Sequence, residues 1–324
     1  MQPTASNIFN DVILGYIILF FSKNDLFSEF SAGAGLNQIA EWRGFEKTRL
    51  KVILRSAESM GVLRLSNESY HLTALGEELS KNRYAFTVMM GGYSELLDSM
   101  DLFLAAPASS WKPYVRGDYV AIGSNEAHEE LMRPIFNNII DALPATCIAD
   151  LGCGNAGRLV ELLGRRRNLT GVGIDIDSKA IEVAEKNRER HNLTKRLTII
   201  RENVFDSLTQ PHPEFESVEL VTSFMMLHDL FNIPELQGQL FARMKAAFPA
   251  AKYFVLADTC LDEKTRDAST MPIFTMGYEL VHALRGIQVF PLSYYEDQFA
   301  RGGLKIVARH DFGVPNTYCF VLEV

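Results

Sequence analysis

The residues most able to do chemistry begin with Asp150 and the three glycines after it, Gly152, Gly154 and Gly157. The apolar residues 146–149 precede them and predict a short buried strand. A strand that turns through glycines into a helix is typical of a nucleotide-binding loop, because glycine permits a tight turn and lets a ligand approach the backbone closely. A carboxylate at Asp150 disfavours a phosphate there and favours a cation. The pattern therefore indicates S-adenosylmethionine (SAM), a sulfonium without phosphate; NAD, or a turn that binds nothing, are the alternatives.

Asp175 ends a second apolar stretch, residues 171–175, and is placed to bind a ribose. A carboxylate can accept hydrogen bonds from both hydroxyls of a ribose diol, which strengthens the SAM interpretation. Asn203, Val204 and Phe205 follow the strand-like stretch 197–200 and would reach the adenine. An ordinary strand end with a phenylalanine in the core has the same pattern. Besides the glycines, the residues expected to hold the cofactor are Asp150, Asp175, Ile176, Asn203, Val204 and Phe205.

His228 is the first candidate for catalysis, because it follows the apolar stretch 220–223 and ligands of open α/β sheets lie beyond the carboxyl ends of the strands. An imidazole suits a general base acting on a hydroxyl, and a structural histidine is the alternative. His282 ends a helix-like segment, residues 272–282, that would carry a second imidazole into the same cleft. Two histidines suggest a metal ion, whereas spacing alone favours a packed His282 paired with Glu279.

Strands and helices alternate along the second half of the chain. Helices are expected over residues 178–191 and 235–248, and strands over residues 197–200, 220–223 and 253–257. Alternation of this kind predicts the doubly wound α/β class, a mostly parallel sheet with helices on both faces. Residues 305–309 and 318–322 predict an antiparallel hairpin that closes the sheet edge.

The first part of the chain has a pattern typical of a winged helix. Residues 36–79 predict two helices, with Gly61 as a C-cap, and then two strands around the turn 66–69. Basic residues on these helices would suit DNA, but the acidic chain favours the solvated faces of a dimerisation module. Helices over residues 84–104 and 125–143 follow. The expected domains are a winged-helix dimerisation domain (1–85), a helical linker and substrate lid (86–140), and a SAM-binding domain (141–324).

Composition limits the classes of function. The chain has 324 residues, 47% of them apolar, and can form two domains with buried cores. A net charge of −8 argues against binding nucleic acid or an anionic membrane and favours a small-molecule substrate. The four cysteines lack C-x-x-C spacing, so reduced thiols in the cytoplasm are expected. The apolar stretch from Val12 to Phe21 is too short to span a bilayer and lacks a basic region before it, so we expect it to be buried in a homodimer contact.

From about residue 140 onward the chain resembles class I SAM-dependent methyltransferases, which have a seven-stranded Rossmann-like sheet with an antiparallel C-terminal hairpin. With a winged helix in front, the whole chain looks like the small-molecule O-methyltransferases, in which a histidine matching His228 acts as base. Residues 222–229, 244–249 and 272–282 are similar to the iron-dependent phenylpyruvate C-methyltransferase and related 2-oxo-acid C-methyltransferases.

This second resemblance implies that His228 and His282 hold a non-haem iron ion, while the substrate's oxo and carboxylate oxygens fill further positions. Asp229 would be a third ligand, an orienting group or a proton acceptor, and we favour the orienting role. A carbon next to a ketone becomes nucleophilic when it loses a proton, and a metal ion chelated by a 2-oxo acid stabilises the resulting enolate. The resemblance also implies that Arg116 faces the substrate carboxylate; a surface arginine near Asp118 is the alternative.

Arg285 lies one turn past His282, where the phenylpyruvate enzyme has an apolar residue. Pointing inward, it would suit a substrate with a second anionic or polar end; pointing outward, it would stabilise its own helix end. The candidate pocket residues are Tyr93, Ser94, Phe274, Tyr278, Arg285 and Phe290, although core packing explains the aromatic ones equally well. The leading prediction is SAM-dependent methylation of the β-carbon of a 2-oxo acid, in the biosynthesis of a natural product or unusual amino acid. A metal-free O-methyltransferase and a DNA-binding regulator are the alternatives.

Overall fold

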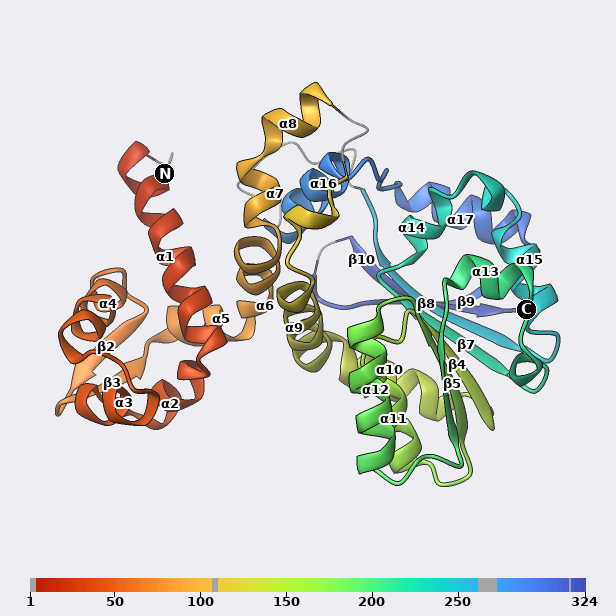
Figure 1. The fold of residues 1–324 in the computed structure, drawn as a ribbon, viewed down its shortest axis with the longest axis horizontal. Helices are drawn as coiled ribbons and strands as arrows, with labels where there is room; N and C mark the ends of the chain where they lie inside the picture. Colours follow the sequence, from red (N-terminus) through yellow and green to blue (C-terminus); the bar gives the residue numbers. More distant parts are fainter. Residues whose placement is uncertain (1–3, 107–109, 262–272, 315) are drawn as a thin grey trace. The chain divides into compact units, whose positions relative to one another are not determined.

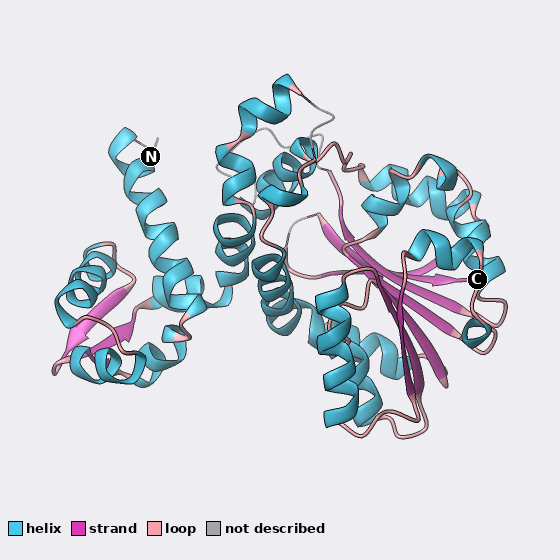
Figure 2. Ribbon diagram, in the orientation of Figure 1, coloured by secondary structure: helices cyan, strands magenta, loops and turns pink. Residues whose placement is uncertain are grey.

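The computed structural model describes residues 4–106, 110–261, 273–314 and 316–324 (Figure 1). It divides into two compact units, Met1–Glu130 and Leu131–Val324. Figure 2 shows that helices dominate the first unit and that the second has a central sheet with helices around it. The expected three-part division at residues 85 and 140 stays a prediction.

Within the first unit, residues 36–72 form two helices followed by two antiparallel strands, in the order expected for a winged helix. The elements over residues 26–81 are α2 (Leu26–Ala32), β1 (Ala34–Gly35), α3 (Leu36–Arg43), α4 (Lys47–Ser59), β2 (Leu63–Ser66), β3 (Ser69–Leu72) and α5 (Ala74–Lys81). The strands pair in the order β1-β3-β2. Asn67 and Glu68, between β2 and β3, have φ values of 48° and 63°, which two-residue hairpin loops require.

The N-terminal helix α1 (Ala5–Lys23) is longer than the apolar stretch within it. Among the described residues it is one helix, of 19 residues, that is long and apolar enough to cross a membrane by length and composition, with 22% of its most apolar window buried. The sequence expectation considered only residues 12–21, which form part of this longer helix. That the chain does not enter a membrane stays a prediction.

Two long helices expected from the sequence are each interrupted. The observed elements are α6 (Arg83–Phe86), the π-helix η1 (Thr87–Gly92), α7 (Ser94–Asp98), α8 (Met100–Ala105), the short 3-10 helix η2 (Lys112–Tyr114), α9 (Gly117–Ala127), the π-helix η3 (His128–Met132) and α10 (Arg133–Ala142). Pro134 has no N–H, and its ring crowds the carbonyl four residues back, which loosens the turn before it. Gly91 lies so close to α9 that a Cβ there would be 2.4 Å from the ring of Tyr119.

The second unit is built on a seven-stranded sheet of the predicted class. Its strands are β4 (Cys147–Leu151), β5 (Thr170–Asp175), β6 (Leu197–Arg201), β7 (Leu220–Phe224), β8 (Tyr253–Thr259), β9 (Lys305–Asp311) and β10 (Thr317–Glu323). They lie in the order β6-β5-β4-β7-β8-β10-β9, and only β10 runs antiparallel to its neighbours β8 and β9. The strand order reverses between β4 and β7, which is where such sheets bind ligands, at the carboxyl ends of the strands.

Helices cover both faces of this sheet (Figure 1). On one face, α10, α11 (Gly157–Arg165) and α12 (Ser178–Arg190) enclose a core with Phe136, Leu163 and Val255 fully or nearly fully buried. The elements of the other face are α13 (Val204–Thr209), η4 (Pro213–Phe215), α14 (Leu227–Phe231), η5 (Pro234–Leu236), α15 (Leu240–Ala247) and α17 (Leu292–Arg301). Successive residues along each buried strand point alternately into these two cores, so both faces of the strand are apolar.

One helix expected over residues 235–248 is divided as well. A 3-10 turn, η5, begins at Pro234, and α15 starts only at Leu240 because Gly238 between them has a φ of 69°. The expected helix over residues 272–282 is present as α16 (Ile273–Leu284). Pro272 and the side chain of Phe274 lie outside the described residues, so the expected place of Phe274 in a substrate pocket stays a prediction.

Candidate active site

The glycine turn after β4 has the backbone shape expected of a ligand cradle. Gly152 and Gly154 have φ values of 73° and 56°, in the left-handed region that favours glycine. The N–H groups of Gly152 and Cys153 both donate to the carbonyl of Ile174 on β5, at 2.9 and 3.0 Å. A Cβ on Gly152 would lie 2.9 Å from Sδ of Met226, so a larger residue would also have to displace that side chain.

Asp175, at the end of β5, holds the turn from the other side. Its Oδ2 accepts the N–H of Gly154 at 2.8 Å, and its Oδ1 accepts the N–H of Asp177 at 2.9 Å. Each oxygen keeps a further lone pair, so the carboxylate can still accept hydroxyl hydrogen bonds. Ile176 beside it is 63% exposed, and an apolar side chain left in solvent at a strand end is available to a ligand.

Asp150 is paired within the protein. Its side chain is buried, its Oδ2 accepts a hydrogen bond from Arg158 at 3.0 Å, and its Oδ1 accepts one from Thr222 at 2.9 Å. Burial raises the pKa of Asp150, and the Arg158 guanidinium opposes that shift. The sequence interpretation missed Arg158, in the first turn of α11, as a partner of Asp150. The expected contact of Asp150 with SAM stays a prediction.

The segment after β6 is ordered by its own side chains. Oδ1 of Asn203 accepts the N–H of Phe205 at 3.0 Å and caps α13. Val204 is 6% exposed and belongs to the sheet core, while Phe205 packs against the same core and is half-buried. The expected contact of these residues with the adenine stays a prediction.

His228 is fixed in a buried position directly after β7. The backbone reverses at Met225, whose φ is 54°, and His228 then enters α14 with only 2% of its surface exposed. Asp258, at the end of the neighbouring strand β8, accepts the N–H of His228 at 2.8 Å and faces its Nδ1 at 2.9 Å. Nδ1 therefore carries a proton, and the lone pair of neutral His228 is on Nε2.

Asp258 is a fully buried carboxylate with an unusually large number of donors. It accepts from the N–H of Thr259 at 2.9 Å and from the hydroxyls of Tyr278 and Tyr295, each at 3.1 Å, in addition to the two groups of His228. Burial alone would raise the pKa of Asp258, but its contacts with His228 and the backbone outweigh burial and lower it. In turn Asp258 raises the pKa of His228 against the effect of burial.

The second predicted histidine meets the first. His282, on α16, is 3% exposed; its Nδ1 lies 2.6 Å from the carbonyl oxygen of Tyr278, and its Nε2 lies 3.1 Å from Nε2 of His228. The two rings are perpendicular, with centroids 4.6 Å apart. Burial, followed by the charges of His228 and Arg285, lowers the pKa of His282 to about 3, so this imidazole is neutral at physiological pH.

Asp229 and Arg285 lie beside the paired imidazoles. Oδ2 of Asp229 is 3.4 Å from Nε2 of His228, and Oδ1 is 3.8 Å from the guanidinium of Arg285. Another nitrogen of Arg285 is 3.3 Å from Nε2 of His282. The side chain of Asp229 is 40% exposed and that of Arg285 only 12%, so Arg285 points inward.

Sequence reasoning missed Asp258 and Tyr295, and it did not predict the contact of Tyr278 with His228. Tyr278 was expected to line a pocket, and its hydroxyl lies against Nδ1 of His228 at 2.7 Å. An acidic residue at the carboxyl end of β8 was a signal for Asp258, since that strand end lies next to β7. Phe290, another expected pocket residue, is 8% exposed and stacks on Tyr294.

Three further predicted substrate residues belong to the unit Met1–Glu130. The guanidinium of Arg116 is 3.5 Å from Asp118, lies 4.0 Å from the ring centroid of Tyr119, and its side chain is 46% exposed. Tyr93 is 7% exposed, and Ser94 begins α7. Their contact with a substrate stays a prediction.

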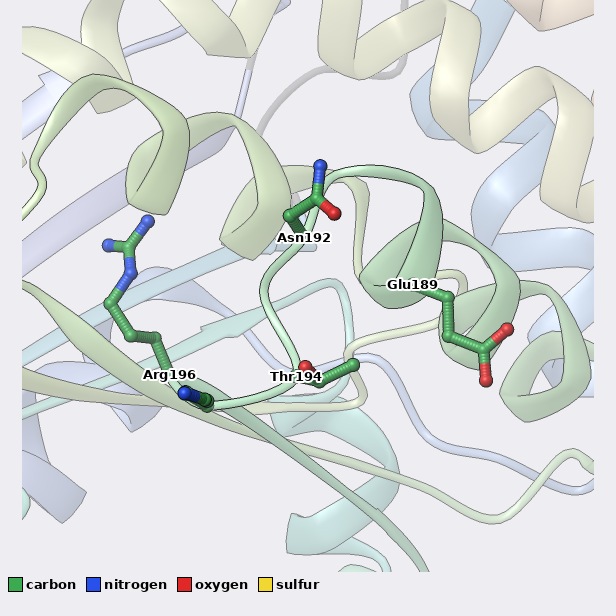
Figure 3. Close-up of a pocket in the computed structure, with 5 residues that line it drawn as sticks. Glu189, Asn192, Thr194 and Arg196 are labelled. Carbon is green, nitrogen blue, oxygen red and sulfur yellow. The ribbon is translucent and has the colours of Figure 1, made fainter.

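A surface hollow lies away from this chemistry. It is lined by Glu189, near the end of α12, and by Asn192, Thr194, Lys195 and Arg196 in the loop before β6 (Figure 3). The hollow is therefore at the amino end of that strand, opposite the carboxyl ends that carry His228 and Asp175. Arg196 is engaged there in donating to backbone carbonyls, including those of Leu163 and Leu169. We assign the hollow a structural role.

The sheet order, the glycine turn and the acidic strand end define a class I SAM-dependent methyltransferase, and residues 144–284 match a family model described as a methyltransferase domain. The chain is 27% identical to an indolepyruvate C-methyltransferase of Streptomyces griseus, with 100% of this chain and 95% of the relative covered. It is 23% identical to a 2-ketoarginine methyltransferase of Streptomyces arginensis, covering 82% and 77% of the two chains. A crystal structure of a putative O-methyltransferase from Nostoc punctiforme has a similar fold, with a TM-score of 0.71 at 14% identity over 100% of both chains.

Proposed function

We propose that this enzyme transfers the methyl group of SAM to the β-carbon of a 2-oxo acid, with His228 and His282 as ligands of an iron ion. The observation that carries the proposal is the contact of the two Nε2 atoms at 3.1 Å. When both rings are neutral, Nδ1 holds the proton in each, and the two Nε2 lone pairs face each other. Such a contact is repulsive unless a cation or a proton lies between the nitrogens.

The residues around the two rings suit a metal ion. Histidines that bind metals generally donate their other ring N–H to a carboxylate or a backbone carbonyl. Here His228 faces the carboxylate of Asp258, and His282 faces the carbonyl of Tyr278. The two Nε2 atoms are 3.1 Å apart, close enough for both to bind the same ion. Both features support the fit.

The substrate class rests on chemistry and on the relatives. Indolepyruvate and 2-ketoarginine, named for the two relatives above, are both 2-oxo acids. Carbon is methylated only after it loses a proton, and iron bound at this site would stabilise the enolate as a Lewis acid. The loop from Gly152 to Gly157 and Asp175 would hold SAM, and Asp229 would orient the groups beside His228.

Methyl transfer itself needs a nucleophilic carbon in line with the sulfonium. The β-carbon gives up a proton to solvent water, the electron pair left on the carbon forms the new carbon–carbon bond, and the carbon–sulfur bond breaks to leave S-adenosylhomocysteine (SAH). Asp258 and the Tyr278 carbonyl keep the protons of both imidazoles on Nδ1 throughout. Neutral rings with a free Nε2 are the form that binds metals.

A metal-free O-methyltransferase is the second candidate, favoured by the Asp258–His228 contact, which would serve a general base. In that enzyme Nε2 of His228 would carry a proton and donate a hydrogen bond to Nε2 of His282. The difficulty is positional, because Nε2 of His282 occupies the place from which a substrate hydroxyl would approach His228. We therefore favour the metal-dependent reaction.

Iron analysis of the purified enzyme, together with a panel of 2-oxo acids and phenols, tests the proposal. We expect about one iron per chain and turnover of at least one aryl, branched, acidic or guanidino 2-oxo acid. His282→Ala should lose both the iron and the activity, whereas a metal-free enzyme would be only weakened. Turnover of a phenol and of no 2-oxo acid would refute the C-methyltransferase.

The chain's expected assembly and compartment also stay proposals. We propose a homodimer that acts in the cytoplasm. All four cysteines are buried free thiols, which suits a reducing compartment. A face of α1 exposes apolar side chains that a second copy of the chain would cover.

A further inference from the structure

Arg285 holds a guanidinium beside the two-histidine site. It follows the last turn of α16, and its side chain is only 12% exposed. One of its nitrogens lies 3.3 Å from Nε2 of His282, the atom that faces His228. A partly buried cation beside two metal-binding imidazoles is unfavourable unless an anion is near.

Asp229 shows how an anion fits there. One of its carboxylate oxygens is 3.4 Å from Nε2 of His228, and the other is 3.8 Å from the guanidinium of Arg285. The carboxylate thus lies between an imidazole and the guanidinium, with one oxygen toward each. Its side chain is 40% exposed and its contact with Arg285 is long, so solvent or another carboxylate can replace it.

We propose that Arg285 binds the carboxylate of the 2-oxo acid substrate, and that Asp229 occupies this place when no substrate is bound. The inference rests on the proposed function and adds the residue that selects for an acid. A planar guanidinium pairs with a carboxylate through two parallel hydrogen bonds, which gives both charge and orientation.

The position of the guanidinium decides which end of the substrate it takes. Because Arg285 contacts the ligand nitrogen of His282 itself, it reaches the carboxylate next to the oxo group and not a distant group on the acid's side chain. The enzyme should therefore require the carboxylate whatever that side chain is. Arg116, which is 46% exposed and contacts Asp118, would not be needed for this contact.

The test compares Arg285→Gln, which keeps a hydrogen-bond donor without charge, with Arg285→Lys, which keeps the charge without the fork. Arg301→Gln, at a 65% exposed site on α17, is the control. Substrates are phenylpyruvate, 4-methyl-2-oxopentanoate, 2-oxoglutarate and 5-guanidino-2-oxopentanoate, and the primary amide of whichever acid is used best. Calorimetry with SAH-bound enzyme gives the dissociation constant of that acid.

We expect Arg285→Gln to raise KM and the dissociation constant for the acid by about ten- to a hundredfold, with a smaller effect on kcat. For Arg285→Lys, both constants should lie between those of Arg285→Gln and those of the parent. Arg301→Gln should have the constants of the parent. SAH affinity should be unchanged in all of them, which shows that the variants are folded.

Two results would overturn the assignment of Arg285: an unchanged KM for the acid in Arg285→Gln, or an equal loss for the acid and its amide. If the parent enzyme turns over none of the four acids, the proposed function fails first and this inference fails with it. A parent that uses an acid, beside a variant that uses it equally well, refutes Arg285 alone.

Discussion

Asp258 accepts hydrogen bonds from both the backbone N–H and the ring Nδ1–H of His228, at 2.8 and 2.9 Å. The two residues come from neighbouring strand ends, β8 and β7, thirty positions apart in the chain. This contact sets the tautomer of the ring, because a carboxylate can only accept. It leaves Nε2 as the atom that is offered to a metal or a substrate.

Asp258→Asn should therefore impair the site although it changes the side chain little in size. An amide can turn its N–H₂ toward Nδ1, which would move the ring proton to Nε2 and block that atom. We expect activity and iron content to fall about 10- to 100-fold, measured by SAH release and by metal analysis. Tyr295→Phe removes one donor to the same carboxylate and should cost much less. Full activity in Asp258→Asn would contradict the orienting role.

The ion pair of Asp150 and Arg158 is expected to matter chiefly for stability. Arg158→Met leaves a buried carboxylate without its cation, which costs about 3–5 kcal/mol of unfolding free energy. Urea unfolding followed by circular dichroism measures this loss. Arg165→Met on the same helix, where the arginine is 36% exposed and pairs with Asp141, should change stability by no more than about 0.5 kcal/mol. Similar losses in the two variants would show that Asp150 is not held by Arg158.

The sheet could be predicted from the sequence because its signals are local. Each buried strand is an apolar run, and the runs alternate with helical segments, so the class of fold and the edge hairpin follow directly. The helix interruptions were missed where one residue outweighs an otherwise helical pattern, as Gly238 and Pro134 do. Local pattern also placed His228 at a strand end.

The partners of the site residues could not be predicted in the same way. Arg158 lies close to Asp150 in sequence, but a short separation in sequence does not show that two side chains are in contact. Only the packing of α11 on the sheet brings the two together. Tyr295 reaches Asp258 from a helix 37 positions later. Contacts of this kind depend on how helices pack against the sheet, and a single sequence gives no measure of it.

Stability should depend on pH through Glu219. Its carboxylate accepts from Lys252 at 2.6 Å and from the N–H and hydroxyl of Thr146, both at 2.8 Å. Lys252 first, and then Thr146, lower the pKa of Glu219 to about 2 from an ordinary value of 4.5. A lowered pKa stabilises the folded state above pH 4.5, and this gain is lost as the pH falls from 4.5 toward 2.

Glu219→Gln should accordingly destabilise the protein at pH 7 by about 1 kcal/mol, after allowance for solvent screening. The difference from the parent should shrink at pH 3. Urea unfolding at the two pH values measures it, with the exposed Glu235→Gln as the control. A difference that is the same at pH 7 and pH 3 would mean that the charge of Glu219 is not responsible.

The exposed face of α1 is expected to hold two chains together. Its large apolar side chains are Ile8, Phe9, Val12, Ile13 and Tyr16, each 46–67% exposed. Their spacing puts them along one side of the helix, and a monomer would leave this apolar surface in water. Replacing Phe9 and Ile13 together by glutamate should place two like charges in the contact and convert a dimer to a monomer.

Light scattering after gel filtration measures the mass of the parent and of the Phe9→Glu, Ile13→Glu double variant. Val52→Glu makes the same kind of change at a 50% exposed position on α4 and should leave the mass unchanged. Circular dichroism checks that each variant is folded, since α1 also buries Ile18 and Phe21 in the core of its unit. A parent enzyme with the mass of one chain, or a double variant that keeps the mass of two, would show that α1 does not form the contact.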